Sequence, residues 1–347
     1  MNSKERWLAV LQRQTPDRIP MDYWGTPEST QKLMAYLGVG DYWEMCERLH
    51  IDVPVSVWPE YSGPKIKERW DYFGRGFRRV ENQTEAYDEV IYHPLAGFHT
   101  VQEVEANYTW PTADWFDYSG IRGQLKGKEH YPVRGGGSEP FLDYTFLRGM
   151  ERAYLDLLEN PELVHYCMNK IVDFNYENTR RIFEQLPGQV TITYIAEDLG
   201  SQENLLFSPK TIREFLFPGM RRMIQLAHEA GVYVFTHSDG AIRKIIPELI
   251  EIGIDLLNPI QWRCKGMERD GLKRDFGDRL IFHGGVDNQQ TLPFGTVDDV
   301  RREVIDNMEI MGRGGGYILA PCHNIQSVSP VENIVAMYET GYEYGKR

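Results

Sequence analysis

Side chains that could carry chemistry recur directly after short apolar runs in the C-terminal half of the chain. They are Glu197, Asp198, His237, Asp239, Asn258, His283, Asp287, Cys322 and His323. Acids and histidines can transfer protons, and histidine, aspartate and cysteine also bind metal ions. A fold that brought the ends of these runs together would therefore assemble one polar site.

His237 and Asp239 stand two residues apart, and Cys322 follows a much later apolar run. One nitrogen, one oxygen and one sulfur ligand, with a fourth position open, would suit a catalytic zinc ion. Such an ion could activate a thiol or polarise an oxygen atom. The sequence thus predicts zinc on these three residues. Without a metal, Asp239 or Glu197 would be the candidate proton donor.

Each of these residues also has an ordinary structural interpretation. Asp239 could cap a helix that begins near Ala241. Glu197 could be a solvated loop carboxylate, and His283 a hydrogen-bonded histidine of the core. Cys322 could be a buried, inert thiol. The combination of these residues at successive strand ends, rather than any one member, favours a functional site.

Five apolar runs predict the strands that must position these side chains. They cover residues 188–195, 232–236, 254–259, 280–284 and 316–320. Alternation with helices implies a parallel sheet, which is either a barrel or an open doubly wound sheet. No G-x-G-x-x-G pattern follows an early strand, which argues against the dinucleotide-binding open sheet. In a barrel, the active site lies at the C-terminal ends of the strands.

Capping signals predict the helices between these strands. Ser208 and Pro209 begin a helix that runs to about Gly231, and a second helix covers residues 241–252. Capping boxes are predicted at residues 296–299 and 329–332.

The N-terminal half is less regular. Residues 18–22 and 51–57 are predicted as the first two strands. Residues 60–145 hold many aromatic residues and glycines, with a hairpin predicted near residues 73–93. We interpret this segment as an insertion that covers the barrel mouth. The whole chain, residues 1–347, is then expected to be a single (β/α)8 TIM-barrel domain.

Composition excludes several classes of protein. The formal net charge of −13 argues against a nucleic-acid partner or an anionic membrane surface. No run of 18 apolar residues predicts a membrane span, and the N-terminus lacks a signal-peptide pattern. The four cysteines are widely separated, which predicts free thiols and a cytoplasmic location.

Several longer motifs resemble the uroporphyrinogen decarboxylase superfamily across nearly the whole chain. The matching segments lie at residues 3–20, 147–164, 237–240 and 314–334. True decarboxylases of this superfamily carry an arginine-rich loop after the first strand, but Met21–Glu28 contains no arginine and two acids. Their Phe-Ser-Asp motif is also missing, since residues 52–57 read DVPVSV.

The resemblance is therefore closer to the cobamide-dependent methyltransferase branch. Members that act on coenzyme M use a His-x-Cys zinc motif and a later cysteine. His237 and Cys322 match the first and last ligands, whereas Asp239 replaces the middle cysteine. The resemblance implies methyl transfer between a small methoxy, amine or thiol compound and a corrinoid carried by a partner protein. It also suggests a homodimer.

Aromatic side chains of the barrel mouth are expected to hold the small compound. Candidates for an apolar pocket are Tyr23, Trp24, Trp58, Tyr61, Tyr194 and Trp262. The residues that we predict to bind substrate are Tyr23, Trp24, Tyr194, Asn258, His283 and Asp287.

Two alternatives remain open. A cofactor-free decarboxylase or lyase acting on another carboxylic acid would place basic side chains deep in the pocket, for example Arg122, Arg134 or Arg148. A non-catalytic binding barrel would have an occluded pocket or one poor in polar groups.

Overall fold

The computed structural model describes residues 1–81 and 86–346. Seven parallel strands form one sheet, and each strand pairs with the next one along the chain. They are β1 (Val55–Val57), β6 (Val133–Ser138), β7 (Ile192–Ile195), β8 (Tyr233–His237), β9 (Leu256–Asn258), β10 (Ile281–Val286) and β11 (Tyr317–Pro321).

Residues 21–25 occupy an eighth position that closes the sheet. Met21 forms a parallel bridge with Leu319, and Gly25 forms one with Ile325. The Met21 carbonyl also accepts the backbone N–H of Asp52, a residue shortly before β1. This segment therefore links the two ends of the sheet, and the fold is the predicted TIM barrel.

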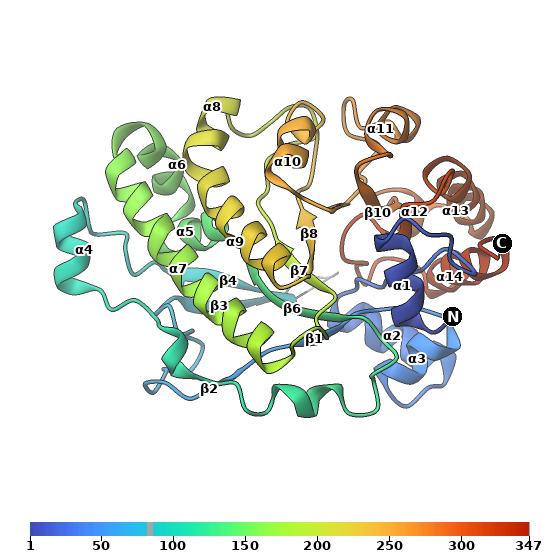
Figure 1. Ribbon diagram of the computed structural model, residues 1–347, viewed down its shortest axis with the longest axis horizontal. Helices are drawn as coiled ribbons and strands as arrows, with labels where there is room; N and C mark the ends of the chain where they lie inside the picture. Colours follow the sequence, from blue (N-terminus) through green and yellow to red (C-terminus); the bar gives the residue numbers. More distant parts are fainter. Residues whose placement is uncertain (82–85, 347) are drawn as a thin grey trace.

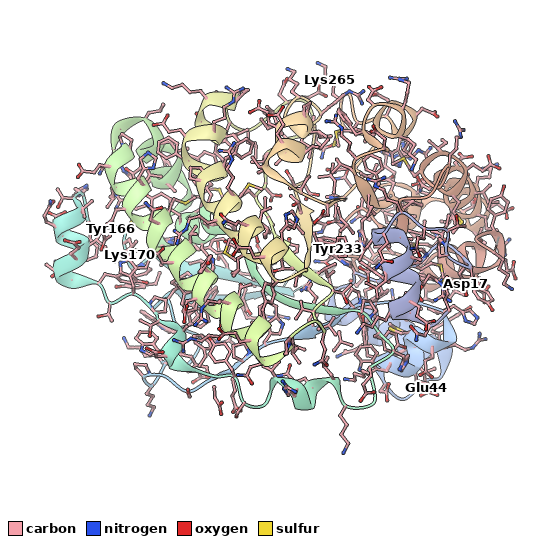
Figure 2. The ribbon with its side chains drawn as sticks, viewed as in Figure 1. Asp17, Glu44, Tyr166, Lys170, Tyr233 and Lys265 are labelled. Atoms are coloured by element: carbon pink, nitrogen blue, oxygen red, sulfur yellow. The ribbon has the colours of Figure 1, made fainter. Side chains whose placement is uncertain are left out.

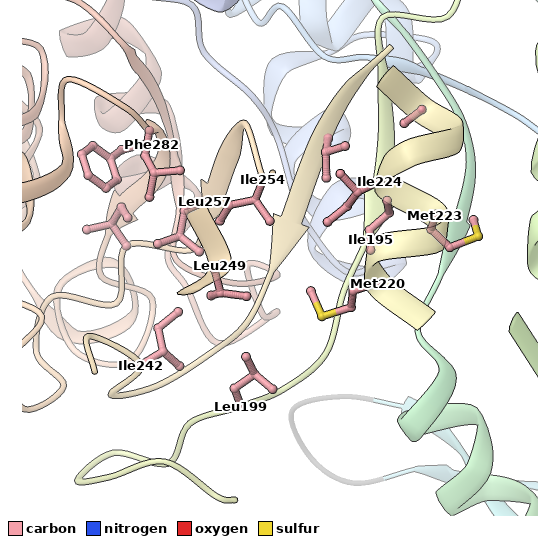
Figure 3. Packing of buried hydrophobic residues seen from close by; sticks show 14 of the residues in the cluster. Ile195, Leu199, Met220, Met223, Ile224, Ile242, Leu249, Ile254, Leu257 and Phe282 are labelled. Carbon is pink, nitrogen blue, oxygen red and sulfur yellow. The ribbon is translucent and has the colours of Figure 1, made fainter. Parts of the chain in front are cut away.

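Helices surround the sheet, with α7 and α9 side by side on one flank (Figure 1). The helices that follow the later barrel strands are α5 (Pro140–Arg148), α6 (Met150–Glu159), α7 (Pro161–Gln185), α8 (Pro209–Thr211), α9 (Phe217–Glu229), α10 (Ile246–Ile252), α11 (Arg269–Phe276), α12 (Thr291–Phe294), α13 (Val297–Met311) and α14 (Val331–Tyr344). Helices α2 (Pro27–Leu37) and α3 (Tyr42–Arg48) follow the first strand position. The apolar faces of all these helices and the outward side chains of the strands form the main core, part of which is shown in Figure 3.

A second core lies inside the barrel at the N-terminal ends of the strands. Helix α1 (Ser3–Leu11) inserts Trp7, which is fully buried, among Ile192, Leu256 and Ile281. An ion pair between Arg6 of α1 and Asp17, which is labelled in Figure 2, holds the helix at this end. The barrel is therefore packed with apolar side chains at its N-terminal end.

The segment predicted as an insertion contains one barrel strand, so its predicted bounds of 60–145 were wrong. Strand β6 pairs with β1 on one side and β7 on the other. Its sequence, VRGGGS, has no alternation of apolar residues because α7 packs against its glycines. A Cβ on Gly136 would come within 2.4 Å of the Thr179 side chain. The segment between β1 and β6 is thus residues 58–132.

That segment contains two small antiparallel sheets and short helices. Its elements are β2 (Glu60–Tyr61), β3 (Gly76–Glu81), β4 (Ala86–Tyr92), α4 (Val101–Asn107), η1 (Ala113–Trp115), β5 (Phe116–Asp117) and η2 (Ile121–Leu125). Strands β3 and β4 confirm the predicted hairpin, whose residues 82–85 lie outside the described part of the chain. Helix α4 and both 3-10 helices contact α7, on the outer side of the barrel. Coverage of the barrel mouth remains a prediction.

Some predicted helix starts were confirmed and others were wrong. The Ser208 cap and the capping box at Thr296 are present. Helix α10 begins at Ile246 rather than near residue 241, so Asp239 caps no helix there. Helix α14 follows Pro330 without a side-chain cap, because the Ser329 hydroxyl is buried and has no partner among the described residues. None of the helices in residues 1–81 and 86–346 is long and apolar enough to cross a bilayer.

Candidate active site

Four polar side chains meet inside the barrel near the C-terminal ends of its strands. They are Asp22 of the first strand position, His237 at the end of β8, Asn258 at the end of β9 and His283 of β10. Each is at most 5% exposed. Polar groups buried this deeply need hydrogen-bond partners, and here they are partners for one another.

The four side chains form a continuous chain of hydrogen bonds. His283 Nε2 lies 2.9 Å from Asp22 Oδ2, and His283 Nδ1 lies 2.7 Å from Asn258 Nδ2. Asn258 Oδ1 lies 2.6 Å from His237 Nδ1. Trp24 Nε1 and the Tyr23 backbone N–H also donate to Asp22, which makes this carboxylate the acceptor that anchors the chain.

This chain sets the tautomer of each histidine. His283 must donate from Nε2 to the Asp22 carboxylate, so its Nδ1 accepts from the Asn258 amide group. The Asn258 carbonyl oxygen can only accept, so His237 donates from Nδ1. His237 therefore keeps the lone pair of Nε2 free. An imidazole whose other nitrogen is held in this way is oriented as a metal ligand.

A cluster that could hold a metal ion includes His237. One ligand atom each from His237, Asp239 and His323 lies within 4.8 Å of the other two. A tetrahedral zinc ion with bonds near 2 Å needs ligand atoms about 3.4 Å apart. Asp239 and His323 are partly exposed, so small rotations of their side chains can close this difference. Two nitrogens and one oxygen with an open fourth position fit a catalytic zinc site.

Cys322, the predicted third ligand, lies outside this cluster. Its Sγ donates to the carbonyl of Ile260 at 3.2 Å, and burial raises the pKa of the thiol well above its usual value. The next residue, His323, faces the cluster instead. Cys322 and His323 both follow β11, and the sequence alone did not show which of the two side chains faces the barrel mouth.

The two acids after β7 have different surroundings. Glu197 is 3% exposed, and its carboxyl accepts the backbone N–H of Phe141 at the start of α5. Burial raises the pKa of Glu197 well above its usual value. Asp198 is half exposed, and its Oδ1 lies 3.8 Å from His237 Nε2. Glu197 therefore supports α5, whereas Asp198 borders the cluster of His237, Asp239 and His323.

Glu139, between β6 and α5, is an acid that the sequence prediction missed. Burial raises its pKa to about 8, and the charges of Asp198, Asp143 and Asp239 act in the same direction. The carboxyl therefore keeps its proton at neutral pH and can serve as a general acid. Glu139 directly follows a barrel strand, as several of the predicted site residues do. It was missed because β6 was not recognised as a strand in the sequence.

A cavity of about 580 Å³ opens beside the hydrogen-bonded chain. The predicted Tyr23, Trp24 and Tyr194 line it, together with Phe235 and Arg134. The Trp24 ring stacks on the His237 ring at a centroid distance of 5.7 Å. The cavity therefore adjoins the ring of His237, which belongs to the cluster that could hold a metal ion.

The other residues predicted to bind substrate lie elsewhere. Asn258 and His283 are fully buried within the hydrogen-bonded chain and do not line the cavity. Asp287 pairs with Arg263 at 2.7 Å and accepts the backbone N–H of Thr291 in the first turn of α12. Trp58, Tyr61 and Trp262 are also absent from the cavity wall formed by the described residues.

Comparisons with known proteins agree on one family. The uroporphyrinogen decarboxylase (URO-D) family model matches residues 121–344. The uroporphyrinogen decarboxylase of Legionella pneumophila is 24% identical over 217 residues, which cover 61% of this chain and 54% of the relative. The methylcobamide:CoM methyltransferase MtaA of Methanosarcina barkeri is 28% identical over 150 residues, which cover 43% of this chain and 41% of the relative.

The chain thus spans about half the length of these two relatives. A solved structure of a methyltransferase from Methanosarcina mazei superposes with a TM-score of 0.69 and 18% identity, covering 99% of both chains, and so has the same fold. The family model covers well over half of the chain, from the 3-10 helix before β6 to the last helix. The chain belongs to the uroporphyrinogen decarboxylase family.

Proposed function

We propose that this protein is a methyltransferase that moves a methyl group between a small methylated compound and a corrinoid carried by a partner protein. The observation that carries the proposal is the cluster of His237, Asp239 and His323 beside an aromatic cavity at the barrel mouth. The similarity to a protein named methylcobamide:CoM methyltransferase supports the same reaction.

The residues of the site have distinct roles in this reaction. Trp24, Tyr194 and Phe235 would hold the apolar part of the methyl donor and exclude water. A zinc ion on His237, Asp239 and His323 would polarise the oxygen, nitrogen or sulfur that loses the methyl group.

The corrinoid of the partner protein would supply the nucleophile that accepts the methyl group, and the bond from the methyl group to its oxygen, nitrogen or sulfur would break. That atom keeps the bonding electron pair and needs a proton. We assign this proton to Glu139, whose pKa burial raises to about 8 in the absence of a metal ion.

A second candidate is decarboxylation of a small carboxylic acid without a cofactor. The relatives named uroporphyrinogen decarboxylase and the presence of Arg134 in the cavity favour it. Of the other predicted arginines, Arg122 is exposed, and Arg148 is fully buried in an ion pair with Asp156. One cation in the described cavity wall suits a substrate with one carboxylate better than a polycarboxylate.

Metal content tests the site directly. We expect near-stoichiometric zinc in the untagged protein, and loss of that zinc in the His237→Ala and His323→Ala variants. Elemental analysis of purified protein measures both. Cys322→Ala is the matched control, because it alters the neighbouring residue while leaving the cluster intact, and it should retain its zinc.

Two results would contradict this ligand set. Loss of zinc in Cys322→Ala, with zinc retained in His323→Ala, would favour the ligands predicted from the sequence, which are His237, Asp239 and Cys322. A wild-type protein that takes up no zinc would remove the metal from the mechanism.

Methyl transfer itself can be followed with free cob(I)alamin in place of the partner's corrinoid. Methoxylated aromatic compounds should convert it to methylcobalamin, which is visible in the absorbance spectrum. His237→Ala should reduce the rate by roughly 100-fold or more, because polarisation of the leaving atom contributes several kcal/mol. Release of carbon dioxide from a carboxylic acid, without methylcobalamin, would favour the second candidate.

A further inference from the structure

Arg134 is a cation in the cavity wall that forms no ion pair with any of the described residues. It is the second residue of β6, and it is the one lysine or arginine among the described residues that line the cavity. Its Nε is buried and makes no hydrogen bond within the described part of the chain. Its guanidinium carbon lies 5.5 Å from the centre of the Tyr194 ring.

The buried arginines among the described residues are paired with carboxylates, whereas Arg134 is only partly buried. Arg148 pairs with Asp156 at 2.6 Å, and both side chains are fully buried. Arg18 pairs with Asp52 at 2.7 Å. Removing a guanidinium from water costs free energy that a carboxylate partner normally offsets. The buried Nε of Arg134 lacks this compensation within the described residues, so an anion entering the cavity would supply its missing partner.

The one described acid of the cavity wall, Asp22, is held by other partners and does not compete with that anion for Arg134. Asp22, the acid of the described cavity wall, already accepts hydrogen bonds from His283, Trp24 and the Tyr23 backbone. Arg134 is therefore available to a ligand.

The neighbouring rings specify the shape of the ligand. Tyr194 lies 6.5 Å from Trp24 and 6.0 Å from Phe235, measured between ring centroids. Its ring also lies 6.0 Å from the ring of His237, in the metal-binding cluster. A small flat molecule lying along Tyr194 could therefore contact Arg134 at one end and reach the metal-binding cluster at the other.

We propose that Arg134 binds a carboxylate of the methylated substrate, and that this substrate is a small aromatic acid. The planar guanidinium can hold both carboxylate oxygens, which orients the ligand as well as binding it. Trp24, Tyr194 and Phe235 pack against the ring, and the methyl-bearing atom lies toward His237. This inference rests on the proposed methyl transfer for the fate of the methyl group, but the binding site itself does not.

Binding of two matched probes tests the inference without any corrinoid or turnover. The probes are 4-methoxybenzoate and its neutral analogue 4-methoxybenzamide, titrated calorimetrically into the wild-type protein and into Arg134→Gln. The benzoate should bind the wild type at least about tenfold more tightly than the amide, because the amide offers the guanidinium one neutral acceptor in place of two charged oxygens. Arg134→Gln should abolish this preference and leave the amide affinity unchanged.

Arg222→Gln is the matched control variant. Arg222 also lies over a tyrosine ring, 5.6 Å from the centre of Tyr176, but it is on α9 outside the barrel. It should keep the preference for the benzoate. The comparison of the two probes on the wild type remains decisive even if Arg134→Gln fails to fold.

Equal binding of the two probes, or a preference that survives in Arg134→Gln, would overturn the inference. Failure of both probes to bind the wild type would overturn the aromatic acid as substrate class. A preference that depends on Arg134, with no methyl transfer to cob(I)alamin from any donor, would retain the carboxylate site and count against the methyltransferase. Methyl transfer from neutral donors alone, unaffected by Arg134→Gln, would support the methyltransferase and count against the carboxylate site.

Discussion

The two ends of the barrel interior are built from the same strands but have opposite chemistry. On four neighbouring strands, an apolar residue at the N-terminal end is followed two positions later by an aromatic or polar residue near the mouth. The pairs are Ile192 and Tyr194, Phe235 and His237, Leu256 and Asn258, and Ile281 and His283. Residues two apart on a strand face the same side, so each pair points into the barrel.

This difference separates stability from function most clearly on β9 and β10, because Ile192 of β7 and Phe235 of β8 also line the cavity. The N-terminal layer surrounds Trp7 and excludes water. The layer near the mouth satisfies its polar groups by mutual hydrogen bonds and leaves His237 Nε2 free for a ligand. Substitutions of Trp7, Leu256 or Ile281 should therefore change unfolding, and substitutions in the second layer should change binding.

The largest expected effect is on stability, at the N-terminal end. Trp7→Ala removes a fully buried side chain from the inner core and should lower the free energy of unfolding by about 3–5 kcal/mol. Urea unfolding followed by circular dichroism measures this change. Zinc bound per folded molecule should stay at the wild-type level.

Leu8→Ala on the same helix is the control, since Leu8 is only partly buried and should cost less. If Trp7→Ala removed zinc from the folded protein, the two layers would not be independent.

Asn258 links the two histidines and offers a sharper test of the mouth layer. Asn258→Ala leaves His237 Nδ1 and His283 Nδ1 without their partner, so His237 loses its fixed tautomer. We expect zinc affinity to fall by about 10–100-fold, as is typical when a partner of a metal-binding histidine is removed. Competition with a chromogenic chelator measures the affinity.

Thr236→Ala is the matched control. Thr236 is also buried at the end of β8, but its hydroxyl has no hydrogen-bond partner among the described residues. Unchanged zinc affinity in Asn258→Ala, or an equal loss in Thr236→Ala, would show that the hydrogen-bonded chain does not orient His237.

The smallest expected effect concerns pH. Glu139 has a folded-state pKa of about 8 instead of 4.5, so the unfolded chain loses this proton at lower pH than the folded protein does. Stability should therefore decrease as pH rises from about 4.5 to 8. Glu139→Gln cannot ionise, so between pH 5 and 8.5 it should gain about 1–2 kcal/mol relative to wild type, after allowance for solvent screening.

Urea unfolding in the presence of a chelator measures this difference, since a bound cation would itself lower the pKa of Glu139. Parallel pH profiles for the two proteins would mean that Glu139 is ionised in the folded state. It could then not serve as the proton donor at neutral pH.

The sequence predicted much of the framework because its strands are apolar and evenly separated by helices. The five C-terminal strands and the hairpin strands lie where the pattern placed them. Strand β6 was missed because Gly135 and Gly136 replace the side chains that reveal a strand, as α7 approaches too closely for them. Glu139 and the position of Arg134 in the barrel were missed for the same reason.

By itself, the sequence determined which residue types stand at the ends of the strands, and this was enough to predict His237 and Asp239 together. Only the tertiary structure decided that His323 joins them while Cys322 is buried against Ile260. It also decided that Asp22, 261 residues before His283, anchors the hydrogen-bonded chain. The physical reason is barrel closure, which determines where each side chain points and brings the first strand position beside the last.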